Sequence, residues 1–441
     1  MNILFVSLGC DKNLCDSEHM LGDLMDRGYT ICDDESIADI IVINSCSFIA
    51  DAMEESIQTI IEMGAYKETG QLKGLIVTGC LAQRFPQDIL KDLPEVDAVI
   101  GTNSYDELVK TIDEVLANKG TKPVVLKDFK GLPRNGRRVL TTGGHFAYLK
   151  IAEGCNKRCT YCIIPYIRGD YRSVPMEDIL LEAKELAEAG VKELILVAQE
   201  TTVYGQDIYG KKSIPDLLNK LCEIDGINWI RILYAYPEEI TDELIQCMAS
   251  QPKICHYIDM PIQHCNDTLL KKMGRKTSKA DIMAIADKLK KAMPDICLRT
   301  TLICGFPGET DEMHKELLQF ISDMKFDRLG AFAYSREDGT VAAKMDNQVD
   351  DEIKNLWKDE VMALQKEISL QNNEGFIGRE LDVFIEGKLV DEGVFVGRTY
   401  RDTPSVDGFI FVSADQELES GQFIKARVNA SEDYDLIGEM I

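Results

Sequence analysis

The segment IAEGCNKRCTYCIIP contains three closely spaced cysteines, Cys155, Cys159 and Cys162. A structural zinc site uses four Cys or His ligands, but no further Cys or His follows Cys162 before Cys222. Three neighbouring thiolates suit a cubic iron–sulfur cluster in which one iron has no protein ligand, and that iron is free to bind a substrate or cofactor. The spacing therefore predicts a 4Fe–4S cluster on these three residues.

Three more cysteines share a second pattern, in which each closes an apolar stretch. VSLGC ends at Cys10, VINSC at Cys46 and IVTGC at Cys80. The stretches have the character of buried parallel strands, and open α/β sheets bind ligands outside the carboxyl ends of their strands. A single cysteine of this kind is usually a small core residue. Three repeats of the pattern favour a second three-thiolate site.

The composition limits the class of protein. The chain has 441 residues, 45% hydrophobic and 28% charged, which suggests about three globular domains. It shows neither a membrane-length apolar run nor a signal peptide at its start, MNILFVSLGCDKN. We therefore expect a cytoplasmic protein with no membrane contact, where clustered cysteines indicate metal binding or catalysis. The net charge of −26 argues against a protein built to grip bare nucleic acid.

Hydrophobic periodicity predicts an α/β chain in four parts. Residues 1–118 alternate short apolar runs with amphipathic stretches, which indicates a doubly wound α/β domain. Residues 119–140 are polar and basic and are predicted to be a linker with at most one strand. Residues 141–373 show six further strands with intervening helices, typical of a partial (β/α)6 barrel, and a closing helix. Residues 374–441 change to short strands with Gly-rich turns, as in a small β-barrel.

The barrel region offers two strand ends suited to a small-molecule cofactor. VAQETTVYG places Gln199 and Glu200 after a predicted strand, where they could hold a ribose or an amino acid moiety. LICGFPGET runs through Gly305 and Pro307 into a helix predicted to open at Glu309. Glycines allow close backbone approach, and a helix N-terminus favours anionic groups. Ordinary helix capping and βα-loop structure explain the same residues, so both interpretations stay open.

The remaining reactive side chains have a structural interpretation. We expect His264 to be a satisfied hydrogen-bonding residue, and the basic stretches KKMGRKTSK (271–279) and RNGRR (134–138) to be solvated. Eight cysteines without a shared spacing are predicted to be buried and uninvolved in chemistry: Cys15, Cys32, Cys222, Cys247, Cys255, Cys265, Cys297 and Cys304.

The Cys-x3-Cys-x2-Cys spacing resembles the radical S-adenosylmethionine superfamily. In that family three cysteines hold a 4Fe–4S cluster whose open iron binds S-adenosylmethionine, and one-electron reduction yields methionine and a 5′-deoxyadenosyl radical. The resemblance implies this cluster at Cys155, Cys159 and Cys162, and it places Tyr161 at the aromatic position beside the adenine. Gln199, Glu200, Gly305 and Pro307 become the other candidates for contact with S-adenosylmethionine.

The whole chain resembles one subfamily, the methylthiotransferases, which join a three-cysteine domain to the radical barrel and an OB-like TRAM barrel. This resemblance implies a second 4Fe–4S cluster, carrying sulfur, at Cys10, Cys46 and Cys80. It also implies two S-adenosylmethionine molecules, one as methyl donor and one as radical source for transfer of a methylthio group to an unactivated carbon. Cys15 departs from the first motif, where an apolar residue is usual.

Two substrates compete within the subfamily. SLGCDKNLCDSE, NSCSFIADAMEES and AYSREDGT resemble the enzymes that methylthiolate the β-carbon of an aspartate of ribosomal protein S-twelve. The alternative enzymes act on isopentenyl- or threonylcarbamoyl-adenosine of tRNA and usually have Gln in place of Asp11. Residues 374–441 contain 6 Lys or Arg and 15 Asp or Glu, a balance of 6 − 15 = −9. A barrel that grips tRNA phosphates is expected to be basic, so the protein substrate is favoured.

The resemblance also implies partners. They are ribosomal protein S-twelve, an electron donor such as flavodoxin or ferredoxin, and a sulfur source; we expect the enzyme itself to be a monomer. An interpretation from a different class is a non-catalytic iron–sulfur scaffold or electron carrier with an OB-like binding module. Conversion of S-adenosylmethionine to 5′-deoxyadenosine distinguishes the two, because a scaffold would not perform it.

Overall fold

The structure of the protein is a computed structural model that describes residues 1–117, 120–133, 136–389 and 393–441. The predicted domain boundary between residues 118 and 119 lies outside the described residues. The chain forms two compact units, each built from three separate segments. The first unit comprises Met1–Thr141, Ala152–Val174 and Ser335–Ala343. The second unit comprises Thr142–Ile151, Pro175–Tyr334 and Lys344–Ile441.

A six-stranded parallel sheet with the order β2-β1-β3-β4-β5-β6 organises the first unit. Its strands are β1 (Asn2–Ser7), β2 (Thr30–Cys32), β3 (Ile40–Ser45), β4 (Gly74–Gly79), β5 (Ala98–Ile100) and β6 (Val124–Val125). β3 and β4 are entirely buried, as expected of central strands that are covered on both faces. β6 comes from the stretch predicted to be a linker, and it pairs with β5 to form an edge of the sheet.

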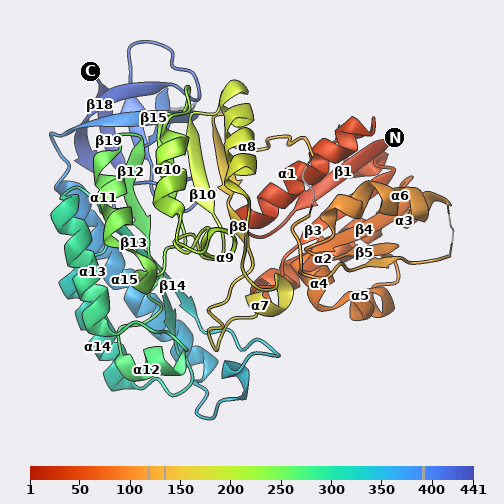
Figure 1. Cartoon of the computed structure of the whole chain (residues 1–441), viewed down its shortest axis with the longest axis horizontal. Helices are drawn as coiled ribbons and strands as arrows, with labels where there is room; N and C mark the ends of the chain where they lie inside the picture. The colour runs from red at the N-terminus through yellow and green to blue at the C-terminus, as the bar shows by residue number, and fades with distance from the viewer. Residues whose placement is uncertain (118–119, 134–135, 390–392) are drawn as a thin grey trace. The chain divides into compact units, whose positions relative to one another are not determined.

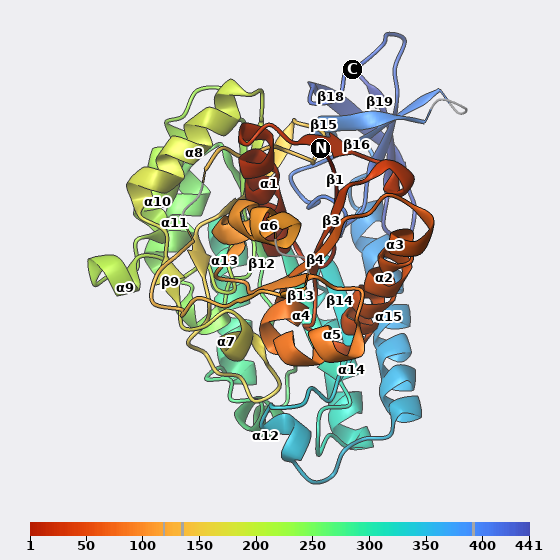
Figure 2. The same ribbon diagram turned by 90° about the vertical axis from the view of Figure 1, so that its right-hand side faces the viewer.

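Helices cover both faces of this sheet, so the predicted doubly wound fold is confirmed. The helices are α1 (Asp11–Asp26), α2 (Ala50–Gly64), α3 (Tyr66–Thr69), α4 (Cys80–Arg84), α5 (Pro86–Asp92) and α6 (Leu108–Ala117). Alternate side chains of β3 divide between the two cores. Ile40 and Val42 pack with apolar residues of α1 and α6, whereas Ile41 and Ile43 pack with α2, α4 and α5. Figure 2 shows α1 and α6 on one side of β1 and β3, with α2 and α3 on the other.

The first unit also contains the cysteine-rich stretch. β8 (Ala152–Glu153) and β9 (Arg172–Ser173) pair antiparallel, and α7 (Ile164–Ile167) lies between them in sequence. The antiparallel pair and α7 are too short to show a hydrophobic period, which is why the sequence did not predict them. These short elements flank the segment that contains Cys155, Cys159 and Cys162.

The second unit contains a six-stranded parallel sheet with the order β14-β13-β12-β11-β10-β7. Its strands are β7 (Phe146–Lys150), β10 (Glu193–Val197), β11 (Trp229–Ile232), β12 (Ile254–Asp259), β13 (Cys297–Cys304) and β14 (Arg328–Ala333). Each of them overlaps one of the six strands expected in this region. The strand order follows the chain order from β7 to β14, as in a partial (β/α) barrel, and the predicted class is confirmed.

Amphipathic helices alternate with these strands. They are α8 (Met176–Glu188), α10 (Ile214–Cys222), α11 (Asp242–Ser250), α13 (Lys279–Ala292), α14 (Asp311–Met324) and α15 (Asp351–Glu374), with the short α9 (Gln206–Tyr209) and α12 (Asp267–Lys272). Successive helices α8, α10, α11 and α13 contact one another, as Figure 1 shows along the outside of the sheet. Within the described residues, no helix combines the length and the apolar character that crossing a membrane requires.

The second unit ends in a closed five-stranded barrel with the order β15-β16-β17-β19-β18. Its strands are β15 (Glu380–Leu389), β16 (Val394–Arg398), β17 (Ile410–Ser413), β18 (Phe423–Ser431) and β19 (Leu436–Met440). Closure removes the exposed strand edges that invite aggregation. The barrel interior is apolar, with Val383, Phe395 and Val412 in its core. The predicted C-terminal β-barrel is therefore confirmed.

Buried ion pairs join this barrel to the parallel sheet. Glu193 of β10 lies between two guanidinium groups: its Oε1 is 2.8 Å from Arg231 Nε, and its Oε2 is 2.7 Å from Arg398 Nη2. All three side chains are fully buried. A buried carboxylate without a partner would cost several kcal/mol, of the order of 3–5, so this pairing fixes the barrel to the sheet.

Candidate active site

The first three-cysteine set lies at one edge of the first sheet. Cys10 precedes α1, which follows β1; Cys46 directly follows β3; Cys80 directly follows β4. β1, β3 and β4 are adjacent parallel strands, so the three residues follow carboxyl ends that meet at one edge. Cys10 is exposed, whereas Cys46 and Cys80 are buried. The fold therefore brings the three strand-end cysteines to one place.

Gly79 sets how closely these strand ends approach. Its φ is +91°, and a Cβ atom added there would lie 2.3 Å from Asn44 Oδ1 and 2.5 Å from Ser45 O. Only glycine accommodates both this left-handed backbone and this close contact. Because Ser45 precedes Cys46 and Gly79 precedes Cys80, the contact positions the two thiols on neighbouring strand ends.

Asn13 ties the same strand ends together through its amide. Its Nδ2 donates to Leu8 O at 3.0 Å and to Ser45 O at 3.2 Å, and its Oδ1 accepts from the Cys80 thiol at 3.8 Å. The Asn44 side chain returns a hydrogen bond of 2.9 Å to Asn13 O. The amide is fully buried, so these bonds hold the edge of the sheet in a fixed arrangement.

Burial controls the protonation of this set. It raises the pKa of Cys46 and raises that of Cys80 to about 12, although the nearby Arg168 guanidinium opposes the rise at Cys80. Both thiols are therefore protonated near neutral pH when no metal is bound. Since a thiolate is the form that ligates, metal binding at this set must displace protons.

The second set occupies the loop between β8 and α7. Gly154 has a φ of +81°, and a Cβ atom there would lie 2.2 Å from Asp170 O. The Cys155 amide donates to Gly169 O at 3.1 Å, and the Cys162 amide donates to Cys159 O at 3.0 Å. These backbone hydrogen bonds fold the loop back on itself. Burial, with the Cys159 and Cys155 thiols, raises the pKa of Cys162 above the ordinary thiol range.

Apolar packing places both sets in the same compact unit. Cys80 forms a buried cluster with Ile163 and Ile167, two residues that follow Cys162 closely in sequence. The chain segment that carries the second set therefore contacts a member of the first set.

Arg168 supplies a polar link between the same segments. Its Nη1 lies 2.7 Å from Asp16 Oδ2 and 3.0 Å from Glu153 Oε2. Its Nη2 donates to Asn13 Oδ1 and, at 3.6 Å, to Cys80 Sγ. Sequence patterns did not identify Arg168. The signal that was available is a basic residue shortly after the Cys155–Cys162 motif, with acidic residues beside both cysteine motifs.

The motif AYSREDGT contributes a third link, through residues 335–343 of the first unit. Glu337 pairs with Arg84, which lies four residues after Cys80 and also donates to Ser47 O at 3.1 Å. The Ala342 amide donates to Thr160 O at 2.8 Å, within the Cys155–Cys162 loop. The segment thus contacts the surroundings of both cysteine sets, a contact that the sequence motif alone did not show.

The donors fit two clusters of the predicted kind. None of the fourteen cysteines forms a disulfide. Over the described ranges, no three His, Cys, Asp or Glu side chains gather closely enough to hold a single metal ion. A four-iron cluster makes a different demand, because each of three thiolates binds a separate iron. Two sets of three thiols, one beside a buried guanidinium that offsets negative charge, meet that demand.

The candidate cofactor residues fall in both units. Tyr161 is half-buried in the first unit, between Cys159 and Cys162. Gln199 and Glu200 follow β10 in the second unit. Glu200 is buried and its Oε1 accepts from the Thr202 amide at 2.9 Å. This bond lies in the turn between β10 and α9, whose N-cap is Gly205, and Gln199 is half-buried at the strand end.

The loop after β13 is organised by Glu309. Its Oε2 accepts the amide of Gly305 at 2.6 Å and that of Phe306 at 3.1 Å. The Gly308 amide donates to Asn347 O at 2.8 Å. These three N–H groups are therefore already paired within the protein, and the helix after Pro307 begins at Asp311 instead of Glu309. The close approach at Gly305 comes from Lys354, whose Cγ would lie 1.8 Å from an added Cβ.

Several structural expectations need correction. Cys32 and Cys222 are only half-buried, while the other six cysteines outside the two sets are buried. Arg275 is buried with its guanidinium 4.1 Å from the Tyr236 ring centroid, so it is not solvated. The Arg138 side chain is only 5% exposed, with its Nη2 2.6 Å from Glu18 Oε2. Arg134 and Asn135 of the same basic stretch lie outside the described residues.

His264 has the hydrogen-bonding role expected of it. Its Nδ1 accepts from the Asn266 amide at 2.9 Å, and its Nε2 lies 3.3 Å from Glu309 Oε1. The ring is fully buried. It therefore supports the loop after β13 through Glu309.

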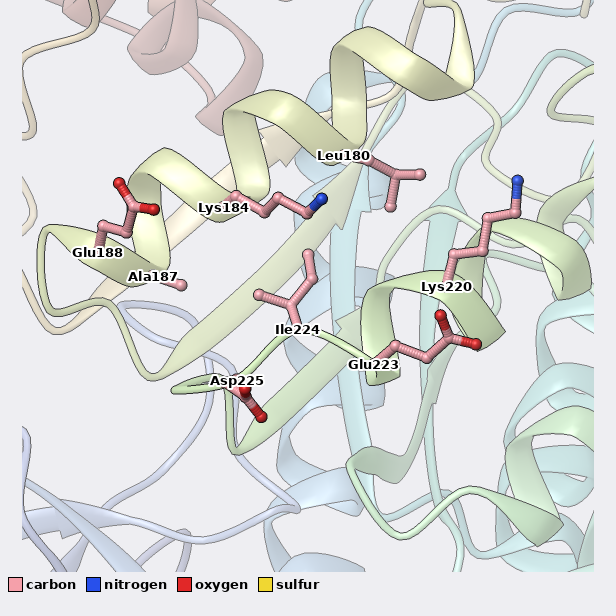
Figure 3. Close-up of a pocket in the computed structure, with 8 residues that line it drawn as sticks. All are labelled: Leu180, Lys184, Ala187, Glu188, Lys220, Glu223, Ile224 and Asp225. Carbon is pink, nitrogen blue, oxygen red and sulfur yellow. The ribbon is translucent and has the colours of Figure 1, made fainter.

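A surface hollow of about 500 Å³ lies between α8 and the turn after α10. Figure 3 shows Leu180 and Ile224 facing the hollow, with Lys184, Lys220 and Glu223 around it. A second hollow, of about 540 Å³, lies beside Tyr209 and Lys211. Neither is lined by a candidate cofactor residue, and mixed charges at their rims do not converge on one ligand chemistry.

Comparisons with known proteins find family matches in three regions of the chain. The radical SAM superfamily matches residues 149–321, the uncharacterized protein family UPF0004 matches residues 2–101, and the TRAM domain matches residues 377–441. Among solved structures, the radical S-adenosylmethionine methyltransferase TsrM from Kitasatospora setae has a TM-score of 0.56 at 15% identity, covering 75% of this chain and 72% of that chain. At that identity the likeness concerns the fold alone.

Similar sequences extend over the whole chain. The ribosomal protein uS12 methylthiotransferase RimO of Lachnoclostridium phytofermentans is 58% identical over 99% of both chains. The RimO proteins of Clostridioides difficile and a Thermoanaerobacter species are 46% and 47% identical, each over at least 99% of both chains. With this identity along its full length, the chain belongs to the RimO family of radical S-adenosylmethionine methylthiotransferases.

Proposed function

We propose that the protein methylthiolates the β-carbon of an aspartate in ribosomal protein uS12, the S-twelve protein of the small subunit. The observation that carries the proposal is the presence of two three-cysteine sets in one compact unit, linked through Cys80, Arg168 and residues 335–343. A 4Fe–4S cluster on Cys155, Cys159 and Cys162 would supply a 5′-deoxyadenosyl radical from S-adenosylmethionine, and one on Cys10, Cys46 and Cys80 would supply the sulfur that a second S-adenosylmethionine methylates.

The chain's own residues hold these donors in place and shield four of the six from water. Gly79 and Asn13 fix the ends of β3 and β4, and Gly154 fixes the start of the second cysteine loop. Burial of Cys46, Cys80, Cys155 and Cys159 restricts water at the ligating sulfur atoms. A reactive radical requires this exclusion, because water and oxygen would divert it.

The surface of the C-terminal barrel supports a basic protein as substrate. Two of its six basic residues, Arg398 and Arg401, are buried. Three others are paired with acids of the barrel: Lys388 with Glu417, Lys425 with Asp382, and Arg427 with Glu380. The outer surface is therefore acidic, which favours encounter with a basic ribosomal protein over encounter with RNA phosphates.

The remaining parts of the proposal concern the cellular setting. We propose action in the cytoplasm as a monomer, with an electron donor such as flavodoxin or ferredoxin and a separate sulfur source. The proposed contacts for S-adenosylmethionine are Tyr161, Gln199, Glu200, Gly305 and Pro307.

Mass spectrometry of ribosomal proteins and tRNA nucleosides tests this function. Cells lacking the protein, and the same cells with it restored, are compared. We expect uS12 to gain about 46 Da, the mass of a methylthio group replacing hydrogen, only when the protein is present. A gain of this mass on a tRNA adenosine with none on uS12 would identify the tRNA enzyme instead. No change in either, with no 5′-deoxyadenosine formed in vitro, would favour the scaffold.

A further inference from the structure

Arg168 is a buried cation in hydrogen-bond contact with a proposed sulfur-cluster ligand, Cys80. The residue is 2% exposed, and its Nη2 lies 3.6 Å from Cys80 Sγ. Its other partners come from two chain segments: Asp16 and Asn13 from α1, and Glu153 from β8. Ion pairs and a hydrogen bond thus hold the guanidinium beside the sulfur.

The charge balance around this group explains why a cation is needed. Asp16 and Glu153 are acidic and nearly inaccessible, with exposed side-chain fractions of 4% each. The cluster's three protein ligands are thiolates, which add further negative charge at this place. Arg168 opposes all of these charges in an environment where water screens little. Cluster potentials respond to net charge and to hydrogen bonds on sulfur, and Arg168 contributes both.

We propose that Arg168 is a positioning residue that stabilises negative charge on the cluster held by Cys10, Cys46 and Cys80, raising its reduction potential and its affinity for an anionic sulfur ligand. The inference rests on the proposed function, because it requires the second cluster. The sign follows from electrostatics: a fixed cation favours the more negatively charged form of its neighbour. Reduction and binding of hydrosulfide both make the cluster more negative, so Arg168 favours both.

The test isolates this cluster by replacing Cys155, Cys159 and Cys162 with Ala in the full chain. The parent protein is reconstituted anaerobically, and its potential is measured by redox titration followed by electron paramagnetic resonance. We expect Arg168→Gln to lower the potential and to weaken hydrosulfide binding several-fold. Arg168→Lys keeps the charge without the forked geometry, so its potential should lie between those of the parent and of Arg168→Gln. Asp16→Asn removes a negative charge and should shift the potential upward.

Arg138→Gln is the matched control. The Arg138 side chain is only 5% exposed and is paired with a carboxylate, that of Glu18. Its Nη2 lies 3.7 Å from a thiol, Cys15, which is not a proposed ligand. We expect this variant to leave the potential and the hydrosulfide affinity unchanged. A general effect of losing a buried arginine would move both variants alike and would overturn the inference.

The outcomes separate this inference from the proposed function. If the parent holds no iron, the second cluster itself is absent and the proposed function fails. If the parent holds iron, and Arg168→Gln has the same potential and hydrosulfide affinity as the parent, the role of Arg168 is wrong while the proposed function stands. If Arg168→Gln cannot hold the cluster, Arg168→Lys and Asp16→Asn decide: potentials that do not shift in opposite directions contradict the inference.

Discussion

Arg84 Nη1 lies 2.7 Å from Glu337 Oε2, although the two residues are separated by 253 positions in the sequence. Arg84 ends α4, the helix that Cys80 begins. Glu337 belongs to the stretch after β14, the last strand of the second unit's sheet. The pair therefore fixes this stretch beside the strand-end cysteines, where Arg84 also bonds to Ser47, the residue after Cys46.

Breaking this pair should loosen residues 335–343. Both side chains are less than a tenth exposed, so removing one leaves a buried charge at a cost of about 3 kcal/mol. We expect Arg84→Met or Glu337→Gln to raise hydrogen–deuterium exchange in that segment, and the double variant to cost less than the sum of the two. Arg427→Met is the control, since its pair with Glu380 is half-exposed and is worth less than about 1 kcal/mol. If Arg84→Met and Arg427→Met destabilised the protein equally, burial would not explain the larger contribution expected of the Arg84–Glu337 pair.

Iron content should divide between the two cysteine sets. Anaerobically reconstituted protein should hold about eight irons per chain, from two four-iron clusters. Replacing Cys155, Cys159 and Cys162 with Ala should remove about half of the iron, and replacing Cys10, Cys46 and Cys80 should remove the other half. Iron and sulfide assays measure this directly. Replacement of the buried Cys247, Cys255 and Cys297 is the control and should leave the iron unchanged. A triple variant of either proposed set that keeps all its iron would show that the ligands are wrongly assigned.

The sequence predicted the elements and the two cysteine sets, but not what joins them. Strands such as β3 are recognisable by their continuous apolar runs. Cys46 and Cys80 directly follow β3 and β4, whereas Leu8 and Gly9 separate Cys10 from β1. Arg168 has no such local signal, because its partners Asp16 and Glu153 are brought to it only by the fold. At Gly305 the sequence did not show that Lys354, from a helix much later in the chain, packs where a Cβ atom would lie. Contacts between distant segments decide these roles, and periodicity carries no information about them.

Cleavage of S-adenosylmethionine should survive loss of the first set. In the Cys10, Cys46 and Cys80 triple variant, dithionite should still drive 5′-deoxyadenosine formation, because the loop of Cys155 keeps its own backbone hydrogen bond to Gly169. Methylthiolated product should be absent. Replacing Cys155 alone should abolish both. Chromatography of the nucleoside products, with uS12 peptide mass followed in parallel, measures the two outcomes. Product from the triple variant would show that sulfur is not supplied at Cys10, Cys46 and Cys80.

Acid should destabilise the second unit through Glu193. Burial raises the pKa of Glu193, but Arg398 and Arg231 more than offset this and hold the pKa below its usual range. When the pKa of a carboxyl is lower in the folded state, its contribution to stability is fully present above its unfolded-state pKa, about 4.3 for Glu. That contribution is lost as the pH falls through the folded-state pKa. We expect Glu193→Gln to lower Tm at pH 7 and to flatten the decline of Tm below pH 5. Glu380→Gln, at the half-exposed pair with Arg427, should do neither. An unchanged Tm profile in Glu193→Gln would mean that the ion pairs do not hold the C-terminal barrel.

The acidic C-terminal barrel should speed encounter with the basic substrate. Asp415 and Glu419 are exposed, and reversing both to Lys changes the charge of residues 374–441 from −9 to −5, since each reversal adds two. We expect a higher KM for uS12, with 5′-deoxyadenosine formation in the absence of substrate unchanged. The control is the double variant Glu185→Lys with Asp287→Lys, at exposed positions of α8 and α13, outside the C-terminal barrel. It gives the same change in net charge and should raise KM less. The difference should shrink as salt rises, because charges are screened over about 8–10 Å at physiological ionic strength. Steady-state kinetics at low and high salt measure both effects. Equal KM values for the two double variants would show that net charge alone, and not the barrel surface, attracts the substrate.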